Sequence, residues 1–250
     1  MNNATAANPF AVNTAPAATP FRTSLKVWLG LVAYLVLVKI VITFFPANFS
    51  SVDQAAVFAW PALGIWAVLG FIGVWFAHKT SFPAAWAAQF FNRQRLWIPI
   101  ALGLTYAVFE VAFDLATGYS KFQIALHHVA KINIDFPASV LIYSGGSIIV
   151  EVIYRLFLIP VLLWLISSLL LGERWQTQVF WTLAILTSFI EPLTQDLDAI
   201  QLGTVMLAAV LLKGFGRNFL QATLFRKYGF LAAILMRIAF YMIWHVVYVH

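Results

Sequence analysis

The feature that most constrains this chain is an almost uninterrupted apolar run at residues 136–171. A helix crosses the hydrocarbon core of a bilayer with about 20 apolar residues, so this run is long enough to span a membrane. Within it, Glu151 and Arg155 lie four residues apart, on the same side of a helix and about 6 Å apart along its axis. Each charge costs roughly 2.5–3.5 kcal/mol at the bilayer centre, so such residues face a bundle interior. Two interpretations stay open: an ion pair that locks helices together, or part of a functional site.

The composition extends this constraint to the whole chain. Hydrophobic residues make up 62% of the 250 residues and charged residues 10%, whereas a soluble domain carries about 25% charged residues. We therefore expect an all-α, polytopic transmembrane helical bundle. The net charge of +6 does not indicate a nucleic-acid partner, because the basic residues lie at the ends of the expected helices. The absence of cysteine excludes disulfides, thiolate metal sites and a cysteine nucleophile. We expect no metal and no cofactor.

The apolar pattern predicts a disordered N-terminal tail at residues 1–24 and a transmembrane helical domain at residues 25–250. Seven spans are expected, at residues 27–45, 55–77, 97–117, 138–160, 178–194, 201–221 and 229–249. An eighth span stays open, because the 136–171 run could be split in two. Aromatic residues opposite polar ones at 80–97 predict an interfacial helix on the membrane surface.

Basic residues predict the orientation of the bundle. With the N-terminus inside and seven spans, ten basic residues are inside: Arg22, Lys26, Lys79, Arg93, Arg95, Arg174, Lys213, Arg217, Arg226 and Lys227. The outer loops hold Lys121 and Lys131. Splitting the 136–171 run would move the basic 213–227 segment outward, which favours one long helix bent near Pro160. We expect an integral protein of a bacterial inner membrane with a cytoplasmic N-terminus.

Ionisable residues inside the expected spans are Lys39, Glu110, Asp114, Glu151, Arg155, Glu191, Arg237 and His245. Three groups repeat a spacing of four residues: Glu110 with Asp114, Glu151 with Arg155, and Arg237 with Tyr241 and His245. Each group would present a polar stripe on one side of its helix. We expect the stripes to meet in one interior cavity, because a charge inside a membrane bundle requires a partner. Glu110 and Asp114 are additional candidates for this polar core.

Two segments carry a family resemblance. Residues 150–155 read Val-Glu-Val-Ile-Tyr-Arg, and residues 222–235 combine a short basic turn, Gly229 and an Ala-rich helix start. The first is similar to the EExxxR motif of the CPBP group of intramembrane proteases, with Val150 in place of the leading glutamate. The second resembles the stretch before that family's last motif, Hxxx(N/D). The group includes CAAX prenyl endopeptidases and bacterial immunity-type homologues. The resemblance covers residues 136–250 and implies the CPBP glutamic-type intramembrane protease fold.

The resemblance also implies catalytic positions, which this chain fills in part. Glu151 matches a glutamate thought to activate water, and Arg155 completes that motif. Arg237 and Tyr241 stand where the family has its last histidine and its Asn/Asp. Glu191 stands near the histidine of the family's FxxxH motif. These departures imply a degenerate active site, in which an ion-pair network replaces the catalytic cluster.

The departures favour a CPBP-like membrane protein that has lost or altered peptidase chemistry. It would act as a scaffold in the lipid bilayer, binding another membrane protein or a hydrophobic peptide segment. One alternative is an active intramembrane endopeptidase that uses Glu151 as the base, with Arg237 and Tyr241 donating to an oxyanion. Another is a proton- or ion-coupled transporter with carboxylates at mid-membrane. His245 lies eight residues beyond the expected last histidine and remains a candidate for the site.

Overall fold

The computed structural model of the chain describes residues 18–45, 55–129, 131–172 and 175–248. It is 84% helical and has no strands among those residues, which confirms the all-α class. Residues 1–17 of the expected tail lie outside the described ranges, and the first helix begins at Phe21.

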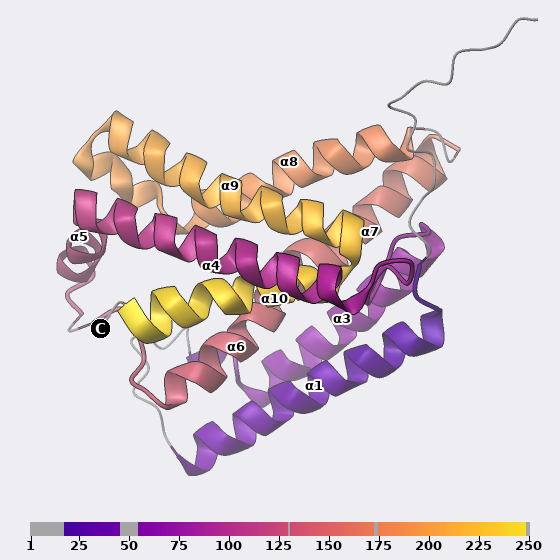
Figure 1. Cartoon of the computed structure of the whole chain (residues 1–250), viewed down its shortest axis with the longest axis horizontal. Helices are drawn as coiled ribbons and strands as arrows, with labels where there is room; N and C mark the ends of the chain where they lie inside the picture. The colour runs from indigo at the N-terminus through magenta and orange to yellow at the C-terminus, as the bar shows by residue number, and fades with distance from the viewer. Residues whose placement is uncertain (1–17, 46–54, 130, 173–174, 249–250) are drawn as a thin grey trace, which may run out of the picture.

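Long helices run back and forth between the two ends of a bundle (Figure 1). In chain order they are α1 (Phe21–Phe44), α3 (Trp60–Lys79), α4 (Asn92–Thr117), α5 (Tyr119–Leu126), α6 (Ala138–Glu151), η1 (Val152–Phe157), α7 (Leu158–Leu163), η2 (Trp164–Leu170), α8 (Gln176–Gln195), η3 (Leu197–Leu202), α9 (Thr204–Tyr228), α10 (Phe230–Tyr241) and η4 (Met242–Tyr248). Among the described residues, five helices are long and apolar enough to cross a membrane: α1, α3, α4, Ala138–Leu170 and Phe230–Tyr248. Helices α8 and α9 are similarly long but less apolar, so the expected seven spans stay a prediction.

The apolar run at 136–171 forms one continuous helix, Ala138–Leu170, and is not split in two. Its α-helical parts alternate with two π-helical stretches, η1 and η2. Pro160 lies between these stretches and lacks the N–H of a regular helical turn. Single π-helical turns frequently occur at functional sites. Stretch η1 begins directly after Glu151 and contains Arg155, so the wider turn determines how this pair projects into the bundle.

The expected interfacial helix at 80–97 is wrong over most of its length, because α4 covers only the last part of it. The residues before α4 form an irregular connection in which Phe82 is fully buried. Pro83 disfavours a helical conformation at Phe82, which explains the missing helix. The connection is attached to the junction of α9 and α10, where the backbone N–H of Phe230 donates to the carbonyl of Ala84 at 2.9 Å.

Glycines bring the central helices close together. Helix α10 contacts α4, α6 and α9 in the middle of the bundle (Figure 1). A Cβ atom on Gly103 of α4 would lie 2.3 Å from the carbonyl oxygen of Met236 on α10. A Cβ atom on Gly73 of α3 would lie 2.2 Å from the carbonyl oxygen of Leu156 on η1. Such close packing encloses the side chain of Arg237 on α10, which is 0% exposed.

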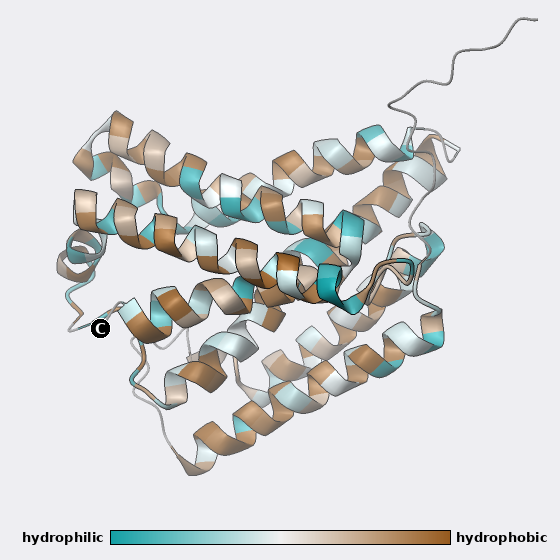
Figure 2. Ribbon diagram, viewed as in Figure 1, coloured by the Kyte–Doolittle hydropathy of each residue, from teal (hydrophilic) through white to brown (hydrophobic). Residues whose placement is uncertain are grey.

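The distribution of polarity fits a membrane protein. Hydrophobic residues cover much of the ribbon (Figure 2). Large apolar side chains such as those of Phe71, Val108 and Leu212 are exposed. Glu151 and Arg155, in contrast, are completely or almost completely buried. In a bilayer, exposed apolar side chains face lipid and charged ones face the bundle interior. The five apolar helices therefore place the chain in a membrane.

Candidate functional site

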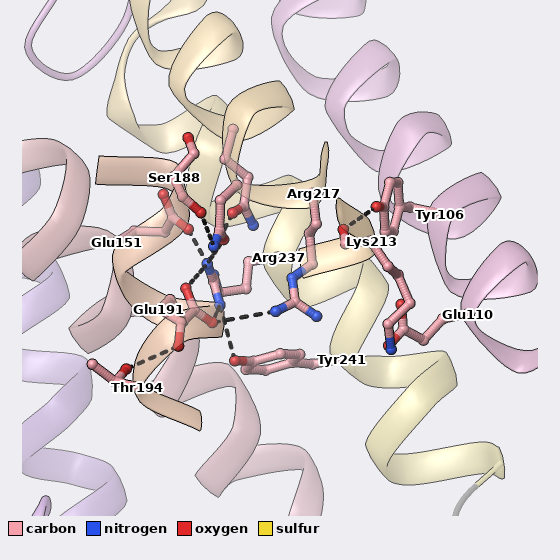
Figure 3. A network of polar contacts seen from close by, with 12 residues as sticks. Tyr106, Glu110, Glu151, Ser188, Glu191, Thr194, Lys213, Arg217, Arg237 and Tyr241 are labelled. Carbon is pink, nitrogen blue, oxygen red and sulfur yellow. Dashed lines mark hydrogen bonds and ion pairs between the residues drawn. The ribbon is translucent and has the colours of Figure 1, made fainter. Parts of the chain in front are cut away.

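Arg237 is the centre of a buried polar network (Figure 3). Its Nε donates to Oε1 of Glu151 at 2.6 Å. Its Nη1 and Nη2 donate to Oε1 and Oε2 of Glu191, both at 2.9 Å, so one guanidinium holds the second carboxylate with two parallel hydrogen bonds. Nη1 also donates to the hydroxyl of Tyr241 at 3.1 Å. Charge-assisted contacts of this geometry are among the strongest hydrogen bonds in proteins. The network joins Glu151, Glu191 and Arg237, three of the positions to which the resemblance assigns a catalytic role.

Two amide side chains of α9 complete the network. Nη2 of Arg237 donates to Oδ1 of Asn218 at 3.0 Å and to Oε1 of Gln221 at 2.8 Å. The amide of Asn218 donates to the carbonyl of Ser188 on α8 at 3.2 Å. The sequence analysis missed both residues because they carry no charge. A signal was present for Gln221 alone, since Lys213, Arg217 and Gln221 repeat the same spacing of four residues on one helix.

The pair that the sequence singled out is looser than expected. Nε of Arg155 lies 3.6 Å from Oε2 of Glu151, and Nη1 lies 3.8 Å from Oε2 of Glu191. The hydrogen bonds of Arg155 go instead to α9, to the carbonyl of Asn218 at 3.0 Å and to Oε1 of Gln221 at 3.2 Å. Oε2 of Glu151 and two nitrogens of Arg155 have no hydrogen-bond partner. Arg237 is therefore the main partner of Glu151, and Arg155 is a secondary one.

Two basic residues that the sequence predicts in a cytoplasmic segment are largely, though not completely, buried in the bundle. Lys213 forms an ion pair with Glu110, with side chains 9% and 4% exposed, and Arg217 lies 3.3 Å from Oε1 of Glu191. The expectation that Lys213 and Arg217 lie outside the bundle is wrong, because both side chains are largely enclosed along α9, which is unbroken from Thr204 to Tyr228. The side of the membrane that this segment faces stays a prediction. The carboxylates inside the bundle attract these cations away from the surface.

A cavity of about 600 Å³ opens beside the network. Four of the predicted site residues line it: Glu110, Glu191, Tyr241 and His245. Glu151, Arg155 and Arg237 are not among its lining residues and lie buried behind it. The expected meeting of polar stripes in one cavity therefore holds for some of the residues only.

Asp114 and His245 have partners outside the network. The carboxylate of Asp114 accepts the backbone N–H of Ser120 at 2.6 Å and the hydroxyl of Tyr248 at 2.9 Å, next to the start of α5. Nδ1 of His245 lies 2.6 Å from Oδ1 of Asn133. Its ring stacks on Tyr143 at 4.3 Å between centroids. Asp114 thus has a local structural contact, whereas His245 forms part of the cavity wall.

The side chains of the network and of the cavity wall do not form a cluster of metal ligands. Within the described ranges, no group of three or more His, Asp or Glu side chains could hold a metal. The carboxylates at the centre are bound by guanidinium groups instead. At the edge of the cavity, burial raises the pKa of Asp196, and the charges of Lys213 and Arg217 oppose this effect. The site holds charges in fixed positions beside a cavity that is large enough for a small molecule.

Comparison of the chain with protein-family models, curated proteins and solved structures finds no match in any of the three. The resemblance to the CPBP group therefore depends on the motif residues alone and stays a hypothesis.

Proposed function

We propose that the chain is a CPBP-like integral membrane protein in which an ion-pair network stands in place of peptidase chemistry. It acts by binding another membrane protein or a hydrophobic peptide segment. The observation that carries this proposal is the contact of one guanidinium with both central carboxylates, Arg237 with Glu151 at 2.6 Å and with Glu191 at 2.9 Å. Arg237 is also the residue that stands where the resemblance implies a catalytic histidine.

The chemistry of a glutamic peptidase supports this choice. Such an enzyme needs a carboxylate that holds a water molecule and nearby donors for the developing oxyanion. Glu151 is 0% exposed and does not line the cavity, so a peptide bond entering the cavity would not reach it. Its Oε1 is already bound by Arg237. The network favours a fixed arrangement of charges over a reactive one.

Cleavage assays test this proposal directly. The purified protein in lipid nanodiscs is offered prenylated peptides and transmembrane helical peptides, and an active CPBP peptidase serves as the positive control for the substrates. We expect no cleavage above the level of Glu151→Gln, which preserves the shape of the side chain and removes its charge. Cleavage by the wild type that Glu151→Gln abolishes would support the endopeptidase alternative instead.

Photo-crosslinking from the exposed face of α3 tests whether a partner binds there. A photo-crosslinking residue replaces Trp75, whose side chain is 46% exposed, and the matched control replaces Leu212 on α9, which is 61% exposed. We expect a defined protein or peptide adduct at position 75 and only lipid adducts at position 212. Lipid adducts alone at both positions would count against a partner on this face.

We further propose a bacterial inner membrane and a cytoplasmic N-terminus. The basis is the positive-inside rule applied to the residues that stay at helix ends, such as Arg22, Lys79 and Lys227. Lys213 and Arg217 no longer contribute to this bias, because both are largely buried in ion pairs.

A further inference from the structure

The cavity is lined by α5, by residues at the end of α8 and by the middle of α9. Helix α5 and the end of α8 lie at the same end of the bundle (Figure 1). The ends of membrane helices lie at the level of the lipid headgroups. A ligand can therefore approach this cavity from water or from the headgroup layer.

Carboxylates outnumber Lys and Arg side chains on the cavity wall by three to two. The charged lining residues are Glu110, Glu191, Asp196, Lys213 and Arg217. Both cations are engaged, Lys213 by Glu110 and Arg217 by Glu191. Among the described residues, Asp196 has no ion-pair partner and accepts a hydrogen bond from the hydroxyl of Tyr119 at 3.2 Å. The wall therefore carries one carboxylate whose charge no direct contact balances.

A second carboxylate on the wall has an oxygen without a donor. Glu110 is 3% exposed, and its Oε2 accepts no hydrogen bond. Leaving a buried acceptor unpaired is costly, so a positive charge bound nearby in the cavity stabilises the carboxylate of Glu110 without contacting Oε2 directly. The raised pKa of Asp196 also indicates a carboxylate that a further positive charge would stabilise. Burial raises this pKa, and the charges of Lys213 and Arg217 offset only part of that effect.

The wall already holds one ammonium group, that of Lys213. Its Nζ contacts Glu110 and lies 4.8 Å from the ring centroid of Phe113, 5.7 Å from that of Tyr119 and 5.9 Å from that of Trp244. These distances fall within the roughly 6 Å over which an aromatic face attracts a cation. Tyr119 and Trp244 also line the cavity. Aromatic faces combined with carboxylates are a common means of recognising organic ammonium ions.

We propose that this cavity binds an organic ammonium group, placed between the carboxylates of Asp196 and Glu110 and against the rings of Tyr119 and Trp244. Two sources share this chemistry: a small water-soluble amine, and the choline or ethanolamine headgroup of a phospholipid. None of these four residues hydrogen-bonds to Arg237, although its partners Glu191 and Tyr241 lie on the same cavity wall. The proposal holds whether or not the chain cleaves peptides.

Calorimetric titration of the full chain in a non-ionic detergent tests the proposal with choline as the probe. We expect choline to bind and its neutral isostere, in which carbon replaces the nitrogen, not to bind. Asp196→Asn should weaken choline binding by about tenfold or more, the effect of losing one favourable charge contact. Trp244→Leu should weaken binding by removing a ring. The matched control is Asp198→Asn, which removes a carboxylate that does not line the cavity and leaves choline binding unchanged.

Three outcomes would overturn the proposal: no choline binding by the folded wild type, equal binding of the neutral isostere, or equal effects of Asp196→Asn and Asp198→Asn. If Asp196→Asn does not fold, Trp244→Leu alone decides, and unchanged choline binding by that folded variant overturns the proposal. Short-chain phosphatidylcholine and phosphatidylglycerol then serve as competitors. Displacement of choline by phosphatidylcholine alone identifies the headgroup as the ligand source, whereas displacement by neither identifies a soluble amine.

Discussion

A buried arginine can neutralise two carboxylates only if its N–H donors, whose directions are fixed in one plane, point at oxygens of both. The guanidinium of Arg237 presents five N–H donors in one plane, and these reach Glu151, Glu191 and the amides of α9. Arg155 is less well satisfied, with Nε and Nη1 lacking hydrogen-bond partners. At the scale of single residues, Arg237 therefore contributes most to holding the network together.

The first prediction concerns the energetic coupling in this network. Arg237→Ala leaves Glu151 and Glu191 without their main counter-ion and should destabilise the protein by about 3–5 kcal/mol. The double variant Arg237→Ala/Glu151→Ala should cost less than the sum of the single variants, because the pair interacts directly. The coupling should exceed that of Arg155 with Glu151, since the contact is 2.6 Å rather than 3.6 Å. Equilibrium unfolding in detergent measures all of these values.

The control for this cycle is the pair of Lys131 and Asp135, whose side chains are 33% and 60% exposed. A surface ion pair contributes only about 0–1 kcal/mol, so its double variant should behave additively. Additive losses for Arg237 and Glu151 as well would show that the buried contact carries no coupling energy.

At the scale of elements, the sequence predicts helices well and irregular segments poorly. The apolar run at 136–171 predicts the single long helix, because length and polarity alone determine a membrane helix. The connection at 80–91 could not be predicted in this way, because its aromatic pattern imitates an amphipathic helix. Phe82 is buried against residues distant in the sequence, Phe180 of α8 and Phe225 of α9. The π-helical turn after Glu151 has no simple sequence signal, so the looser Glu151–Arg155 contact was not predictable.

The second prediction tests the packing of α4 on α10. Gly103→Ala places a Cβ atom 2.3 Å from the backbone of Met236, so one helix must shift. Overpacking of this kind typically costs about 1–3 kcal/mol. Gly30→Ala on α1 is the matched control, since no atom lies within 4 Å of its added Cβ. We expect a lower melting temperature for Gly103→Ala and an unchanged or slightly higher one for Gly30→Ala; equal melting temperatures would show that α4 and α10 have room to separate.

One end of the whole bundle is strongly basic, whereas the other carries both acidic and basic residues. Helices α1, α4, α8 and α10 begin at the same end (Figure 1), and Arg22, Arg93 and Arg95 lie there in α1 and α4. Asp196 and Asp198 lie at the opposite end, between α8 and α9. The polar stripes inside the helices are predictable from spacing, but the burial of Lys213 and Arg217 is not, because it depends on carboxylates contributed by other helices.

The third prediction fixes the topology of this arrangement and decides whether α8 crosses the membrane. The chain has no cysteine, so single cysteines can replace Gln94, exposed in the first turn of α4, and Gln201, exposed in η3. If α4, the helix Ala138–Leu170 and α8 all cross, the two positions lie on opposite sides. We expect a membrane-impermeant thiol reagent to label Gln201→Cys in intact cells and Gln94→Cys only after permeabilisation, because basic residues flank position 94. Labelling from the same side would mean that α8 does not cross, and the reverse pattern would place the N-terminus outside.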